Sequence, residues 1–208
     1  QKRIANVSIG SSKPTTFSTT LDKYTQIDHF FLPKDVSLVT FNETLAKLKD
    51  YHLIIADIQD MSRFAAKNFG LTENSISFLK QLNKQNQTIL TILGSPYSLK
   101  YFQDFNTVLV GYNEEEEAES IAAQIIFGAR GAEGTMPVTV GKFQYGDGEC
   151  TQSNMRLKYG NPMEVNMNIK TLQKADAIIY KAMEDKILPG AQLLVVKDGN
   201  VVYEKAYG

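Results

Sequence analysis

Short apolar runs of strand length alternate with helical patterns along residues 4–147 of this 208-residue chain. Ile4–Ile9 is apolar and β-branched and stops at Gly10, and Tyr51–Ile58 is an almost unbroken apolar run. Continuous apolar strands are typical of parallel sheets, because helices cover both of their faces. The alternation therefore predicts an α/β fold, with a mostly parallel sheet and helices on both faces in a three-layer sandwich.

The same pattern predicts the individual elements. Strands are expected at Ile4–Ile9, Ile27–Leu32, Tyr51–Ile58, Thr88–Leu93, Thr107–Tyr112 and Met136–Val140. Helices are expected at Phe17–Tyr24, at Glu43–Asp50, at Leu71–Lys84, and between Asn113 and Phe127. Asn42 and Asn113 are the expected N-caps of the second and the fourth of these helices.

The composition changes after residue 141. Residues 141–168 are rich in Gly, Asn, Ser and Gln without a sustained period, and we interpret residues 148–168 as a linker. Ile169–Ile187 has a helical pattern, and the turn Lys197–Asn200 between two apolar runs suits a tight β-hairpin. We expect a domain over residues 1–147 and a C-terminal helix and β-hairpin over 169–208. That second unit is too small to stand alone.

Charge and composition argue against several classes of protein. The 22 Lys and Arg residues nearly balance 23 Asp and Glu residues, so no positive charge is in excess for nucleic acid. Cys150 is the single cysteine, and with only two histidines it cannot complete a Cys/His zinc site. No apolar run has the length of roughly 18 residues that a membrane span needs. We expect a globular protein with no metal, no cofactor, no nucleic acid and no membrane span.

Two polar segments resemble ligand sites but fit structural roles better. The loop Gly10–Thr16 follows the first strand, where a phosphate loop would lie, yet it has one glycine and matches neither nucleotide-binding pattern. Glu114–Glu117 is a run of four carboxylates, but successive helical residues point in different directions and cannot converge on one ion. We expect this run, with Asn113, to cap a helix.

Nucleophilic catalysis is not expected from this chain. Ser77 and Lys80 form a Ser-x-x-Lys pattern, but the pattern lies inside a predicted helix and has no companion motif. His29 and His52 lie in or beside apolar strands, where a hydrogen-bonded structural histidine is the common outcome. We therefore name no catalytic residue.

The best candidates for a functional surface follow two central strands. Asp57 and Asp60 lie at and just after the end of the strand Tyr51–Ile58, and the turn Gly94-Ser95-Pro96-Tyr97 follows the next strand. Open α/β sheets gather functional groups at the carboxyl ends of their strands. Asp57, Asp60, Gly94, Ser95, Pro96 and Tyr97 are therefore the candidates for facing a ligand or a partner domain, with loop capping as the simpler alternative.

Four segments together resemble a known domain family. They are Ile92–Leu99, Val108–Asn113, Ala122–Ala129 and Gly134–Val140. Their order and spacing are similar to those of the C-terminal α/β sandwich domain of family 3 glycoside hydrolases, in the β-N-acetylhexosaminidase-like branch. The resemblance implies the three-layer fold over residues 1–147.

Residues 169–208 resemble a different family. Leu188–Ala191, Val195–Gly199 and Tyr203–Gly208 are similar to the start of the penicillin-recognising serine hydrolases, which include class C β-lactamases. Proteins of this combined kind carry a catalytic barrel first, the sandwich second and the serine hydrolase third. The resemblance thus implies two partners in a parent chain, an upstream barrel and a downstream serine hydrolase domain. We expect the present chain to be cut at both ends.

The two resemblances imply a non-catalytic part of a multidomain glycoside hydrolase that acts on amino-sugar glycans. The glycosidase carboxylates belong to the barrel, and the Ser-x-x-Lys pair of the serine hydrolases follows a hairpin of this kind, so neither set maps onto this chain. The resemblance also implies export of the parent to the periplasm or cell envelope. Two alternatives remain: a stand-alone small-ligand or nucleotide-binding domain, and a protein-docking module that dimerises through the free edge of its hairpin.

Overall fold

The computed structural model describes residues 2–153 and 156–208 and separates them into two compact units. The first unit contains residues up to 127 and residues 131–152, and the second contains residues 128–130 and the chain from Ser153 onward. In the described part of the chain, no helix combines the length and the apolar character that crossing a membrane would require.

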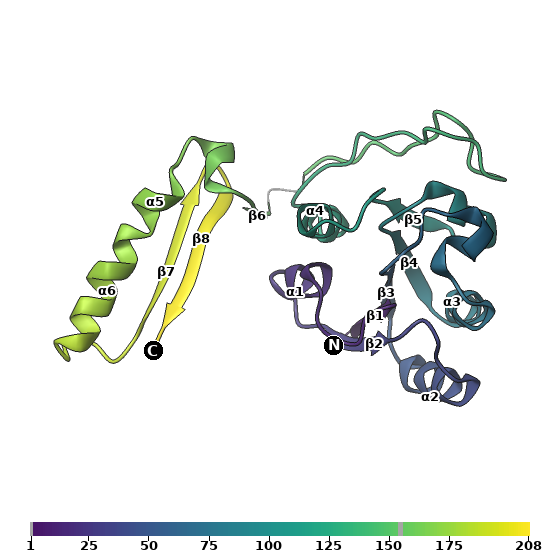
Figure 1. The fold of residues 1–208 in the computed structure, drawn as a ribbon, viewed down its shortest axis with the longest axis horizontal. Helices are drawn as coiled ribbons and strands as arrows, with labels where there is room; N and C mark the ends of the chain where they lie inside the picture. Colours follow the sequence, from purple (N-terminus) through teal and green to yellow (C-terminus); the bar gives the residue numbers. More distant parts are fainter. Residues whose placement is uncertain (1, 154–155) are drawn as a thin grey trace. The chain divides into compact units, whose positions relative to one another are not determined.

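A five-stranded parallel sheet forms the centre of the first unit (Figure 1). Its strands are β1 (Ile4–Ile9), β2 (Asp28–Leu32), β3 (Leu53–Ile58), β4 (Gln87–Ile92) and β5 (Thr107–Val110). Their order in the sheet is β2-β1-β3-β4-β5, and every neighbouring pair is parallel. The predicted mostly parallel sheet is therefore confirmed.

Helices cover both faces of the sheet. Helices α1 (Thr16–Asp22) and α4 (Glu116–Ile126) pack side by side on one face, where Phe17 and Leu21 meet Ala122. Helices α2 (Leu38–Leu48) and α3 (Glu73–Gln85) cover the other face, where Phe41 stacks on Phe78. Two 3-10 helices, η1 (Ala65–Gly70) and η2 (Pro96–Tyr101), follow β3 and β4. This arrangement confirms the predicted three-layer sandwich.

The start of helix α2 differs from the prediction. The helix begins at Leu38 rather than Glu43, and Ser37 caps it by accepting a hydrogen bond from the Thr40 amide at 3.2 Å. Asn42 lies inside the helix. A serine is as good an N-cap as an asparagine, and Phe41 in the first turn completes the buried stripe.

The predicted strand Met136–Val140 does not join the sheet. Met136 instead pairs with the chain that returns toward the body, donating to the Asp147 carbonyl at 2.7 Å and accepting from the Gly146 amide at 2.9 Å. Val140 forms only an isolated bridge with Phe143. Residues 131–152 thus run out and back as an irregular extension, here called the arm, which lies over α4 and β5 in Figure 1.

The second unit is a small α/β structure. Its three-stranded sheet has the order β6-β8-β7, with β6 (Lys158–Tyr159), β7 (Ala191–Lys197) and β8 (Asn200–Tyr207). The unit also contains η3 (Pro162–Val165), α5 (Ile169–Leu172) and α6 (Lys174–Glu184). Strand β6 and η3 lie within residues 148–168, the segment interpreted as a linker. Strands β7 and β8 form the expected hairpin, whose turn uses positive φ at Asp198 and Gly199.

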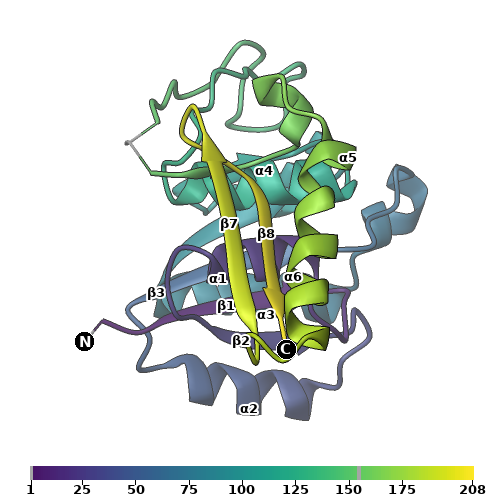
Figure 2. The same cartoon turned by 90° about the vertical axis from the view of Figure 1, so that its left-hand side faces the viewer.

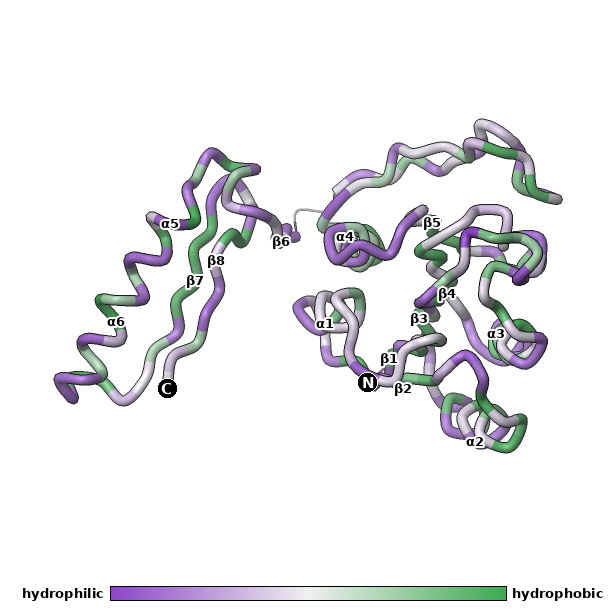
Figure 3. Tube along the Cα trace, in the orientation of Figure 1, coloured by the Kyte–Doolittle hydropathy of each residue, from purple (hydrophilic) through white to green (hydrophobic). Residues whose placement is uncertain are grey.

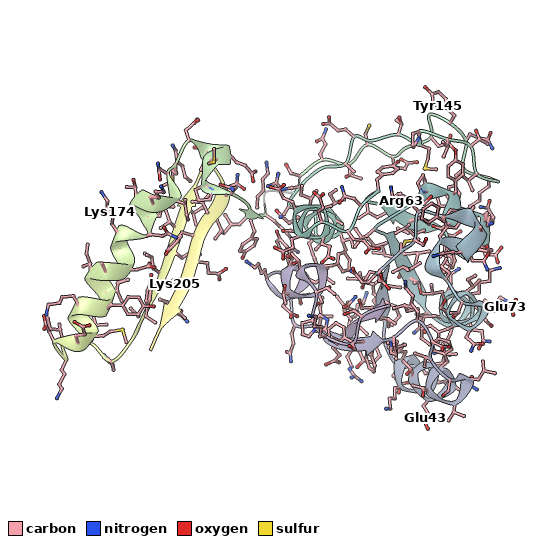
Figure 4. The ribbon with its side chains drawn as sticks, in the orientation of Figure 1. Glu43, Arg63, Glu73, Tyr145, Lys174 and Lys205 are labelled. Atoms are coloured by element: carbon pink, nitrogen blue, oxygen red, sulfur yellow. The ribbon has the colours of Figure 1, made fainter. Side chains whose placement is uncertain are left out.

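One carboxylate holds α6 on the hairpin. Oδ1 of Asp176 in α6 accepts hydrogen bonds from the hydroxyls of Tyr203 at 2.6 Å and Tyr207 at 2.8 Å, and its Oδ2 pairs with Lys205. Figure 2 shows α6 running alongside the hairpin, and Figure 4 marks Lys205 on β8. The Lys205 hydrogen bond, followed by those of the two tyrosines, lowers the pKa of Asp176 to about 2.

We predict that Asp176→Asn loosens α6 from β8. The amide keeps one acceptor for the tyrosines but presents an N–H group to Lys205. The expected result is faster amide hydrogen exchange at Lys205 and Tyr207. In the unaltered chain, the protection of the same two amides relative to their intrinsic exchange rates should also fall as the pH falls from about 4 toward 2, because a lowered pKa stabilises only the ionised form.

Asp185→Asn is the matched control, because Asp185 at the end of the same helix pairs with Lys181 one turn earlier, and both side chains are exposed. Equal acceleration in both variants would contradict a docking role for Asp176.

Candidate functional site

At the carboxyl edge of the sheet, the loops after the neighbouring strands β1 and β3 lead to helices on opposite faces. The loop after β1 leads to α1 on one face, whereas the loop after β3 leads through η1 to α3 on the other. In doubly wound sheets ligands bind at such a point. The residues at the ends of β1 and β3 are therefore the first place to look for a site.

Asp57 lies at this point but is fully buried, with 0% of its surface exposed. Its Oδ1 accepts a hydrogen bond from Asn6 Nδ2 at 2.7 Å, and its Oδ2 accepts from Ser8 Oγ at 2.7 Å and Gln59 Nε2 at 2.9 Å. Asn6 and Ser8 are on β1, so the carboxyl group joins the two central strands. All its hydrogen bonds come from neutral donors.

Burial raises the pKa of Asp57 to about 6. Hydrogen bonds from Ser8, Gln59 and Asn6 act in the opposite direction, and the charge of Glu119 adds to the rise. A carboxyl group with this pKa can hold or release a proton near neutral pH. It cannot reach a ligand from its present position, because helices α1 and α4 cover it.

Glu119 is a second buried carboxyl group on the same face. It belongs to α4, and its Oε2 accepts a hydrogen bond from the Phe17 amide at 2.8 Å in the first turn of α1. Burial raises its pKa, and hydrogen bonds from the Phe17 and Thr16 amides and from Gln59 lower it. Glu119 thus satisfies the N-terminus of a neighbouring helix.

Asp60 lies three residues after Asp57 but in a different environment. It has a positive φ of 53°, its side chain is exposed, and its Oδ2 pairs with Lys34 Nζ at 2.8 Å. Lys34 also donates to the Asp60 carbonyl, and its own carbonyl accepts from Thr72 Oγ1 at 3.1 Å. This lysine therefore ties together the loops that follow β2 and β3.

The turn Gly94–Tyr97 lies beside the loop after β3. A side chain at Gly94 would come within 2.9 Å of Met61 Cβ, so the two loops touch. Pro96 occupies the first turn of η2, and the Ser95 carbonyl accepts from the Ser98 amide at 3.1 Å and hydroxyl at 2.8 Å. Tyr97 points its ring outward with 51% of its surface exposed.

Glu114 completes this edge from the loop after β5. Its Oε1 accepts from the Met61 amide, and burial raises its pKa. The predicted N-cap Asn113 is wrong, because α4 begins at Glu116 with Glu115 as its N-cap, and Asn113 Oδ1 accepts from the Glu115 amide at 3.1 Å in the loop before the helix. Glu114 had no distinguishing signal in the sequence, since it stands in a run of four glutamates.

The structure brings some of the predicted site residues together and separates others. The loop that carries Asp60 meets Gly94 through Met61, at the exposed edge of the sheet. Asp57 is sealed beneath α1 and α4 and is not part of that edge. Within residues 2–153 and 156–208, no cluster of His, Cys, Asp and Glu has the grouping that a metal ion needs.

The remaining polar candidates have structural positions. His29 places Nδ1 3.0 Å from Asn6 Oδ1 and Nε2 2.8 Å from Asp22 Oδ1, so it links β2 to β1 and α1. Gly10 has a φ of 99° and packs on the Gln59 carbonyl. A glycine is needed there for close approach of the backbones, which explains the single glycine of that loop.

The strand order and the switch point define a doubly wound α/β domain of the flavodoxin-like kind. Among solved structures, the fold is similar to a fungal multidomain GH3 β-N-acetylglucosaminidase, described as having a unique GCN5-related glucosamine N-acetyltransferase region. That match has 15% identity and a TM-score of 0.55, and it covers 72% of this chain but 17% of the other.

More distant folds also match. The heterodimer of the RPS4 and RRS1 TIR domains matches with 12% identity and a TM-score of 0.41, over 61% of this chain and 97% of that one. The CpaE pilus assembly structure from Burkholderia thailandensis matches with 9% identity and a TM-score of 0.38, over 59% and 95%. No family model and no curated protein matches the sequence.

We predict that Asp57→Asn alters the pH dependence of stability. The folded-state pKa is about 6 against 3.8 as the ordinary value, so the folded chain keeps a proton that the unfolded chain releases. Stability should therefore fall by about 2 kcal/mol from this group as the pH rises from 4 to 6. The amide variant should lack this fall, measured by urea unfolding at both ends of the range.

Asp104→Asn, at an exposed carboxylate of the same unit, serves as the control and should follow the unaltered chain. A constant difference between Asp57→Asn and the unaltered chain at all pH values would show that folding does not change the pKa of Asp57.

A second prediction concerns the contact between the loop after β3, which carries Met61, and the turn Gly94–Tyr97 after β4. Gly94→Ala should destabilise the first unit by about 1–3 kcal/mol, because the added methyl group meets the Cβ and Sδ atoms of Met61 at 2.9 Å. Gly134→Ala is the matched control, since nothing lies within 4 Å of its added Cβ. Urea unfolding of both variants measures the difference, and equal stabilities would show that the loops are not in contact.

Proposed function

We propose that this chain is a non-catalytic part of a multidomain glycoside hydrolase that acts on N-acetylated amino-sugar glycans. Its first unit packs against a catalytic barrel and supports it. The observation that carries the proposal is the likeness of the fold to the fungal multidomain GH3 β-N-acetylglucosaminidase, of which this chain matches a small part. In this chain, the four segments that resemble the family 3 sandwich domain, between Ile92 and Val140, lie on or beside β4, β5, α4 and the arm.

The loops at the carboxyl edge of the sheet support a role in contacting another domain. Phe64, Tyr97 and Tyr112 follow β3, β4 and β5, and each ring is largely exposed. Aromatic residues are enriched where proteins meet partners. Asp60 and the turn Gly94–Tyr97 belong to the same edge, so we propose that they face the barrel.

The state of Asp57 agrees with a non-catalytic role. A glycosidase needs carboxyl groups that reach the sugar on both sides of the scissile bond. Asp57 and Glu119 are buried, and their oxygens accept hydrogen bonds from the chain itself. The two carboxyl groups therefore stabilise the fold and do not face a sugar.

The second unit supports the proposed start of a serine hydrolase domain. Much of β7 is hydrophobic, as its green colour in Figure 3 shows, and several apolar residues of the helix, the hairpin and the turn between them are exposed. They include Ile178, Ile187, Leu194 and Val196. Exposed apolar faces of this kind need a further layer of structure to cover them. We propose that a downstream serine hydrolase domain provides that layer.

A protein-docking module is the second candidate, favoured by the edge of the small sheet. Strand β7 is the last strand in the order β6-β8-β7, and within the described residues no strand pairs with its other edge. Pairing of two copies through β7 would give a dimer that light scattering detects at micromolar concentrations. The carbonyl of Val201 accepts from the Gly160 amide on the side away from β7, so its partner Val196 points its own N–H group to the free edge. A Val196→Pro variant should then be monomeric, because proline cannot donate to a ladder.

The main proposal predicts that the purified chain does not hydrolyse a chromogenic N-acetyl-β-glucosaminide. Activity should instead belong to the barrel encoded upstream in the same reading frame, and the barrel should lose stability when this chain is removed. The measurement compares the melting temperature and turnover of the barrel with and without the chain. Robust turnover by the chain alone, or a reading frame without a barrel, would overturn the proposal.

A pair of surface variants makes the comparison specific. Tyr97→Glu, in the proposed barrel-facing edge, should lower the melting temperature of the two-domain protein. Glu43→Lys, on the outer side of α2 (Figure 4), should leave it unchanged. Melting of the isolated chain must be equal for both variants, so that the effect is on the contact and not on the fold.

A further inference from the structure

A cleft of about 1140 Å³ lies between strand β5, helix α4 and the arm. All its lining residues belong to the first unit. Residues of β5 and α4 form one wall of the cleft, and residues of the arm form the other. Figure 1 shows the arm running over α4 and β5. The cleft therefore lies along the side of β5 and reaches Gly111 and Tyr112 at the end of that strand, but its lining does not include the loops that carry Asp60 and Tyr97.

The edge of β5 that borders this cleft carries unpaired backbone groups. Strand β5 is the last in the order β2-β1-β3-β4-β5, so β4 pairs with only one of its two edges. The Gly111 amide donates to the Ile92 carbonyl at 2.8 Å, so residue 111 and alternate residues before it point toward β4. The N–H and C=O groups of Val108 and Val110 consequently point into the cleft.

The walls beside this edge are apolar. Ile121 and Ile125 of α4 line one side, and Met136 and Phe143 of the arm line another. Ile121 is 38% exposed although it lies in the middle of a helix. A sheet edge with exposed backbone groups and apolar flanks favours the addition of another strand.

The charged residues in the lining of the cleft are all acidic. Glu133, Asp147 and Glu149 of the arm belong to the lining, and no lysine or arginine does. Asp147 also accepts a hydrogen bond from the Gln144 amide at 2.7 Å, so its carboxylate is fixed in place. An occupant with positive charges at its ends would complement this rim.

The arm leaves room for an occupant and does not fill the space itself. Gly134 lies in the lining, and no atom is within 4 Å of a Cβ added there. The strand-like segment of the arm is already paired within the arm, since Met136 is bonded to Asp147 and Gly146. The segment Met136–Val140 is therefore not the sixth strand of this sheet.

We propose that this cleft binds an extended peptide segment, aliphatic in its middle and basic at its ends, as an added strand on β5. Main-chain hydrogen bonds to Val108 and Val110 hold the segment in register. Alternate aliphatic side chains contact Ile121 on one side and Met136 on the other. The terminal cations meet Glu133 and Glu149.

The test uses the whole chain and a synthetic peptide in which valine and isoleucine alternate between terminal lysines, so that both faces of the added strand are aliphatic. Fluorescence anisotropy measures binding, and hydrogen exchange measures protection of the Val108 and Val110 amides. Saturable binding with new protection at both amides is expected. The same peptide with terminal glutamates should bind at least roughly tenfold more weakly, and the difference should shrink at high salt.

Two variants locate the site. Val110→Pro removes an outward N–H group without breaking the ladder to β4, and Ile121→Glu places a charge on the apolar wall. Each should weaken binding by roughly tenfold or more. Val39→Glu, at an exposed apolar residue of α2, is the control and should bind as the unaltered chain does.

Three outcomes would overturn the proposal. They are absence of binding, binding that is unchanged by Val110→Pro and Ile121→Glu, and amides of Val108 and Val110 that are already protected in the free chain. The last outcome would mean that the arm itself occupies the edge. Since hydrogen exchange is read on the unaltered chain, the test does not depend on either variant folding.

Discussion

A parallel sheet must be covered on both faces, and this requirement organises the first unit. Phe41 and Phe78 close one face, while Phe17, Leu21 and Ala122 close the other. Between β1 and β3 the second face also contains a polar group, the carboxyl of Asp57. Its three hydrogen bonds replace the water that burial removes, so the network can persist inside an apolar layer.

Sequence patterns predicted the fold well because it depends on apolar periodicity. The apolar run of β3 and the buried stripes of α3 and α4 were recognisable without long-range information. The predicted start of α2 was wrong because several polar residues near Leu38 can cap a helix, and only the packing of Phe41 selects Ser37. Met136–Val140 has the composition of a strand, but composition does not specify which strand it pairs with.

The candidate site was predictable only as far as single loops allow. Asp60 and Gly94 follow neighbouring strands, and the parallel topology brings their loops together. Glu114 bonds to the Met61 amide, about 50 residues away in the sequence, and Glu119 bonds to the Phe17 amide, about 100 residues away. Contacts between such distant segments depend on the packing of the whole fold, so local sequence patterns do not predict them. Whether Asp57 is exposed or sealed depends on α1 and α4, which no local pattern near Asp57 encodes.

The buried carboxyl group of Asp57 also couples folding to proton uptake. Its pKa of about 6 exceeds the ordinary value of 3.8, so at a pH between these values the chain gains close to one proton when it folds. The heat of unfolding in that interval therefore includes the heat with which the buffer accepts the proton. The calorimetric unfolding enthalpy of this domain therefore depends on the buffer as well as on the protein. Enthalpies measured in different buffers agree only at a pH where Asp57 has the same charge in the folded and the unfolded chain.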